Sequence, residues 1–121
     1  MRDGRLDHYD ESEPIDLRLP QGNGPVWGMA SEDLNATLLC WAPGDGVADH
    51  INAERDVLIL VIEGSGLAIL DGVEHSLHVH DALVIKKQTR RRILAGARGL
   101  RYLSVHLRRG LLQIDPFPRP S

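Results

Sequence analysis

The chain of 121 residues is long enough for one domain with a single core and too short for two. Hydrophobic residues make up 42% and charged residues 26%, with a net charge of −3, which is typical of a globular protein. Because no apolar stretch approaches the roughly 20 residues of a membrane helix, and the acidic, polar start does not resemble a signal peptide, we expect a cytoplasmic protein without a membrane partner.

The chain begins with an acidic segment, residues 1–20, that has no apolar periodicity and ends in Pro20. We interpret it as an extension that is loose or laid over a partner. From residue 21 onward, short runs of β-branched and apolar residues alternate with turn signals. These runs favour strands at 26–30, 34–42, 56–62, 66–70, 75–79, 82–87, 90–95 and 100–107.

Three turn signals separate the later runs: EGSG at 63–66, DG at 71–72 and GARG at 96–99. EGSG and DG have the composition of β-hairpin turns. Many short strands without helical periodicity predict an all-β sandwich or barrel, which we place at residues 21–112. Residues 113–121 form a Pro-rich tail that cannot extend a sheet.

The run DVLILVI at residues 56–62 is apolar on both of its faces. Such a strand is covered on both sides, by the barrel interior on one and by a second sheet or subunit on the other. For so small a chain, we expect a homodimer that covers the outer face.

Basic residues are concentrated late in the chain. Residues 82–114 contain nine Lys or Arg and no acidic residue, and five of the nine stand in KKQTRRR at 86–92. A run of this kind is typical of a nucleic-acid-binding patch. It could equally be a surface on which the acidic start of a chain packs.

Residues 44–64 resemble the first signature of the cupin superfamily. That signature is a Gly, five residues, a His, one residue, a second His, three or four residues, a Glu, six residues and a Gly. His50 matches the first His, Asn52 replaces the second, and Asp56 stands in the place of the Glu. Seven residues follow Asp56 before the closing Gly, so counting back from that Gly puts Val57 in the acid's place. A one-residue slip turns a strand side chain to the opposite face, which leaves the direction of Asp56 open.

Residues 80–95 fit the frame of the second cupin signature without a gap, although every signature residue is changed. In place of its Gly, Pro, Gly, His and Asn stand His80, Lys86, Gln88, Arg91 and Ala95. The resemblance covers about residues 25–108 and implies a single cupin barrel, the double-stranded β-helix or jelly roll. In this frame Arg91 points into the barrel while Arg90 and Arg92 point outward, so nucleic-acid binding becomes a minor hypothesis.

The resemblance also bears on metal binding, because metal-binding cupins use three His and one Glu near the barrel mouth. Here the amide of Asn52 is a weak donor toward transition-metal ions, and Arg91 stays protonated and repels a dication. We therefore expect no metal cofactor. The alternative is a divalent transition metal on a non-standard set, His50, Asp56 and His106, in a cupin enzyme of the dioxygenase or isomerase type.

Without a metal, the resemblance groups His50, Asn52, Asp56 and Arg91 around one cavity, and two interpretations remain open. In the first, Arg91 and Asp56 form a buried ion pair that fills the barrel. In the second, Arg91 offers its planar fork of donors to a carboxylate or phosphate, while His50 and Asn52 hold the rest of a small molecule. Our leading hypothesis is a metal-free cupin that binds a small molecule, and the sequence indicates no particular reaction.

Overall fold

The structure is a computed structural model that describes residues 13–108. These residues form the seven antiparallel strands Gly24–Ala30 (β1), Leu34–Trp41 (β2), Gly46–Ile51 (β3), Val57–Leu70 (β4), Val73–His78 (β5), Ala82–Ile85 (β6) and Arg90–Leu107 (β7). They contain no helix that is long and apolar enough to span a membrane. The prediction of an all-β fold is confirmed.

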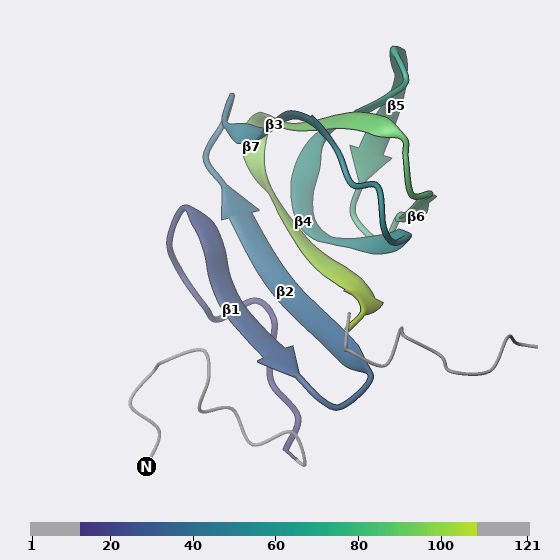
Figure 1. The fold of residues 1–121 in the computed structure, drawn as a ribbon. Helices are drawn as coiled ribbons and strands as arrows, with labels where there is room; N and C mark the ends of the chain where they lie inside the picture. Colours follow the sequence, from purple (N-terminus) through teal and green to yellow (C-terminus); the bar gives the residue numbers. More distant parts are fainter. Residues whose placement is uncertain (1–12, 109–121) are drawn as a thin grey trace, which may run out of the picture.

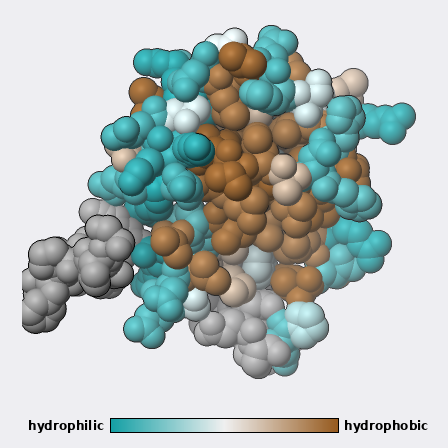
Figure 2. All heavy atoms as spheres, turned by 90° about the vertical axis from the view of Figure 1, so that its right-hand side faces the viewer, coloured by the Kyte–Doolittle hydropathy of each residue, from teal (hydrophilic) through white to brown (hydrophobic). Residues whose placement is uncertain are grey.

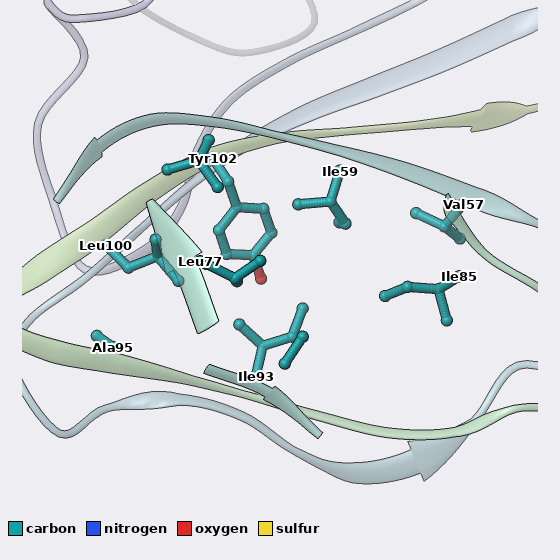
Figure 3. Packing of buried hydrophobic residues seen from close by; sticks show 10 residues of the cluster. Val57, Ile59, Leu77, Ile85, Ile93, Ala95, Leu100 and Tyr102 are labelled. Atoms are coloured by element: carbon teal, nitrogen blue, oxygen red, sulfur yellow. The ribbon is translucent and has the colours of Figure 1, made fainter. Parts of the chain in front are cut away.

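The two longest strands, β4 and β7, take part in two sheets. One sheet has the order β1-β2-β7-β4-β6, and the other has the order β3-β7-β4-β5. Each long strand bends from one sheet into the other, so the sheets enclose a common interior (Figure 1). Tyr102 and aliphatic side chains from both sheets fill this interior and form the core (Figure 3).

Glycine-rich segments form the bends, and here two turn predictions were wrong. EGSG lies inside β4 and GARG inside β7, so neither segment reverses the chain. A Cβ on Gly64, whose φ is 82°, would lie 2.1 Å from the carbonyl oxygen of Gly99. The glycines thus let the two strands approach closely where both bend. The DG hairpin is confirmed, since β4 and β5 are joined by Asp71 and Gly72, both with positive φ as in a type I′ turn.

The backbone keeps the frame of the second cupin signature although its side chains are changed. His80 and Gln88 stand at the two glycine positions of that signature, and their φ angles are 76° and 69°. The left-handed region costs a non-glycine residue roughly 1–2 kcal/mol. These two residues therefore adopt a conformation that suits the glycines they replace.

The outer face of the larger sheet is apolar, as the two-sided pattern of DVLILVI predicted. Leu58 and Leu60 point outward with 41% and 36% of their surface exposed, while their strand neighbours Val57, Ile59 and Val61 are buried. The strand register continues this face in two apolar rows, Val84–Leu58–Val105–Ala36–Met29 and Ala82–Leu60–Leu103–Leu38–Trp27. Leu38 and Trp27, at the end of the second row, are buried, so the exposed part of the face lies around Leu58 and Leu60. In Figure 2, which looks onto the right-hand side of Figure 1, hydrophobic side chains form a broad area bordered by hydrophilic ones.

A buried arginine ties the end of the N-terminal extension to the sheet. The Nε of Arg101 donates to Glu63 at 3.1 Å, and its Nη1 donates to the carbonyl oxygens of Leu17 at 3.2 Å and Pro20 at 2.7 Å. Most of the predicted extension, residues 1–12, and the predicted tail, residues 113–121, lie outside the described residues.

Candidate functional site

A cavity of about 170 Å³ opens into the interior between the two sheets. Most of its wall is aliphatic and is formed by Leu39, Val47, Val57, Ile59, Ile85 and Ile93. Its polar lining consists of His50, Arg91, Tyr102 and Ser104. Among residues 13–108, no carboxylate lines this cavity.

A bulge in β3 and the alternation of β7 direct the polar residues inward. Val47 and His50 are three positions apart, so a regular strand would turn them to opposite faces. The register of β3 shifts between them, and both reach the cavity. On β7, Arg91 shares the inward face with Ile93 and pairs directly with His50 across the strands.

A short hydrogen-bonded chain fixes the guanidinium of Arg91. Its Nε donates to His50 Nε2 at 3.2 Å, and His50 Nδ1 lies 2.8 Å from the carbonyl oxygen of Ala48. Because a guanidinium only donates, Nε2 must accept, and the imidazole proton therefore lies on Nδ1 and is donated to Ala48. Burial lowers the pKa of Arg91, yet a guanidinium remains charged at neutral pH.

The other end of the Arg91 side chain is unpaired. Within residues 13–108, neither Nη1 nor Nη2 of Arg91 has a hydrogen-bond or ion-pair partner. The ion pair with Asp56, the first of the two interpretations above, is therefore not formed. A half-buried cation directed into an aliphatic cavity is left without an anion.

Tyr102 supplies a second donor to the same space. Trp41 Nε1 donates to its hydroxyl oxygen at 3.3 Å, and because an indole N–H only donates, the tyrosine keeps its own proton available. Burial raises the pKa of Tyr102, so the hydroxyl stays protonated at neutral pH. Figure 3 shows the hydroxyl oxygen directed into the interior, toward Leu77 and Ile93.

The structure places the other two predicted ligand-binding residues away from this cavity. The side-chain oxygen of Asn52 accepts the backbone N–H of Glu54 at 3.0 Å, in the turn that precedes β4. A carboxylate oxygen of Asp56 accepts the backbone N–H of Lys87 at 2.8 Å. Val57 lines the cavity instead. The structure therefore has the register obtained by counting back across six residues from the closing glycine of the first signature, which puts Val57 in the place of the Glu.

The residues of the alternative metal set are not brought together. His106 Nδ1 lies 3.3 Å from Nη1 of Arg55, whereas Asp56 caps a turn. In the part of the chain that the structure describes, no three His, Cys, Asp or Glu side chains gather in a group that could hold a metal ion. With Arg91 beside His50, the donors present do not suit a transition-metal ion.

The arginines that flank Arg91 confirm the predicted directions of the basic run. Arg90 and Arg92 are exposed, while Arg91 lines the cavity. Arg90 forms an ion pair with Asp49 at 2.9 Å.

Sequence reasoning did not single out Tyr102 and Ser104 as site residues. A signal was present, since the two alternate with His106 along LRYLSVHL and therefore share one strand face. What the sequence did not show was that this face lies opposite Arg91. Nor did it show that Trp41 would occupy the acceptor of the tyrosine hydroxyl.

No family model matches this sequence, and no curated protein sequence does either. Solved structures do match the fold. KdgF from a Halomonas species is 21% identical, with 71% of this chain and 79% of that one covered at a TM-score of 0.63. An RmlC-like cupin from Shewanella frigidimarina is 17% identical, with 64% and 68% covered at a TM-score of 0.59.

A third likeness covers more of both chains. A conserved protein with a double-stranded β-helix domain from Klebsiella pneumoniae is 17% identical, with 78% of this chain and 88% of that one covered at a TM-score of 0.67. At these identities the likeness concerns the fold alone. The strand order, the two bent strands and these structures together show that the chain has the cupin fold, the double-stranded β-helix.

Proposed function

We propose that this protein binds a small anionic molecule in its barrel cavity and that binding does not depend on a transition metal. The observation that carries the proposal is the guanidinium of Arg91, which lies half-buried in the cavity wall with both terminal nitrogens unpaired among the described residues. A charge removed from water needs a partner of opposite sign. A carboxylate or phosphate of a ligand provides one, since its oxygens match the donor fork of arginine.

The surroundings of Arg91 support a fixed binding group. The hydrogen bond from its Nε to His50 at 3.2 Å holds the plane of the guanidinium and leaves the two terminal nitrogens for the ligand. A donor pair that is already oriented loses little conformational freedom when a ligand binds.

Binding fits these residues better than catalysis does. Among the described residues, His50 is the one imidazole that lines the cavity, and the lone pair of its Nε2 already accepts from Arg91. It is therefore not free to take a proton from a ligand as a general base. In the part of the chain that the structure describes, no carboxylate lines the cavity to serve in its place.

Equilibrium titration tests the proposal. Protein treated with EDTA is titrated calorimetrically with acetate, pentanoate, phosphate and sulfate, and at least one of them should bind with one-to-one stoichiometry. A charge-assisted contact contributes about 1.5–3 kcal/mol, so Arg91→Leu should weaken binding by roughly 10- to 150-fold.

The matched control is Arg92→Leu, because this neighbouring arginine is exposed on the outside of the barrel and should not matter. The proposal fails if none of the anions binds, if binding appears only after a metal is added, or if the two variants behave alike.

A further inference from the structure

We infer that the ligand is a short aliphatic monocarboxylate, held with its carboxylate against Arg91 and Tyr102 and its hydrocarbon chain against the isoleucine wall. This inference rests on the proposed function and narrows it from anions in general to one chemical class.

Among the described residues, the polar groups that line the cavity offer mainly hydrogen-bond donors. The terminal nitrogens of Arg91 donate, the hydroxyl oxygen of Tyr102 already accepts from Trp41 while its proton remains to be donated, and the acceptor nitrogen of His50 is occupied by Arg91. The hydroxyl of Ser104 has no hydrogen bond to any described residue, so it can turn its proton toward a ligand oxygen. Such a set selects a group that only accepts, and an ionised carboxylate is such a group.

Beyond these donors, the described residues offer no further polar side chain to the cavity. The rest of its wall comes from aliphatic side chains of both sheets, among them Ile59, Ile85 and Ile93. A second carboxylate or several hydroxyl groups on the ligand would lose hydration there without regaining hydrogen bonds. A hydrocarbon chain gains by leaving water for the same surface.

The volume limits the length of that chain. A water molecule takes about 30 Å³ in the liquid, so a cavity of 170 Å³ holds roughly six non-hydrogen atoms of that size. Because His50 at the rim is exposed, one or two further atoms fit at the opening. Carboxylic acids of about four to six carbons meet this limit.

The test compares four probes of similar size on the whole protein by calorimetry: pentanoate, its neutral isostere pentanamide, succinate and phosphate. Pentanoate should bind at least tenfold more tightly than each of the others. One hydrogen bond to a charged group corresponds to a loss of roughly tenfold or more, so Tyr102→Phe should weaken pentanoate by that factor. Should Tyr102→Phe not fold, Ser104→Ala tests the same donor set.

The aliphatic wall is tested by chain length. Ile59→Val removes one methylene from the wall, and the best-bound acid should then be one carbon longer than for the wild type. Unchanged chain-length preference in this variant would overturn the inference.

The outcomes separate the two proposals. If succinate or phosphate binds through Arg91 as tightly as pentanoate, the monocarboxylate inference is overturned while the proposed function stands. If pentanamide equals pentanoate, or if no probe depends on Arg91, both are overturned.

Discussion

Replacing Arg91 by leucine should leave the stability of the ligand-free protein almost unchanged. Most buried arginines behave differently, because their removal strands an ionic partner inside the protein. Arg91 has no such partner among the described residues, so its contribution to folding is small.

The expected magnitude follows from what Arg91→Leu removes and adds. The variant loses the hydrogen bond from Arg91 to His50 at 3.2 Å, and a bond of this kind contributes about 0.5–1.5 kcal/mol. Two gains offset this loss. Burial disfavours the charged guanidinium of Arg91 and lowers its pKa, and the variant no longer carries this cost. The leucine also adds apolar surface beside Ile93. The loss and the gains nearly cancel, so the free energy of unfolding should change by less than about 1 kcal/mol.

Arg101 provides the matched comparison, because it lies on the same strand with its partners in place. It is 5% exposed, forms an ion pair with Glu63 at 3.1 Å and donates to the carbonyl oxygens of Leu17 and Pro20. Arg101→Leu leaves two carbonyl oxygens without their donor, whereas the exposed Glu63 can return to water. The cost should be about 2–4 kcal/mol.

Urea unfolding at neutral pH, in a buffer free of carboxylate and phosphate, measures both variants. The reasoning would be refuted if Arg91→Leu lowered the free energy of unfolding by about 3 kcal/mol or more, the size expected for a broken buried ion pair, and if adding Asp56→Asn restored it. That result would reveal an ion pair between the two residues.

Three further predictions concern the rest of the fold. The uncharged outer face around Leu58 should be covered by the same face of a second copy of the chain. Light scattering at micromolar concentration should therefore give twice the mass of the chain for the wild type and the mass of one chain for Leu58→Glu. A monomeric wild type would contradict this. Gln88→Gly should stabilise the fold by up to about 1 kcal/mol because φ is 69° there, and an equal or lower urea midpoint would argue against strain at this turn. Folding raises the pKa of Tyr102 above its ordinary value of 10.0, so the free energy of unfolding should be highest below pH 10 and decline as the pH rises further. This decline should be smaller in Tyr102→Phe. Equal declines in the two proteins would show that Tyr102 is not its cause.

The sequence predicted those features that depend on neighbours along the chain or on a motif frame. The run DVLILVI, apolar on both of its faces, predicted that the outer face of β4 would be apolar as well as the inner one. The second signature placed Arg91 in the barrel, even though each of its own residues is changed, because the frame is kept by the backbone at His80 and Gln88.

Features that depend on distant strands were not predictable in the same way. EGSG and GARG have the residues of a turn, and only the pairing of β4 with β7 decides that they bend without reversing. Asp56 and Val57 differ by one position in register, which decides which of them enters the cavity.

The most direct test of the central claim is a crystal structure of the protein grown with pentanoate. We predict a carboxylate within hydrogen-bonding distance of Arg91 and Tyr102, with its hydrocarbon chain against Ile59. A structure in which Arg91 extends into solvent or pairs with Asp56, with no pentanoate in the cavity, would contradict the claim.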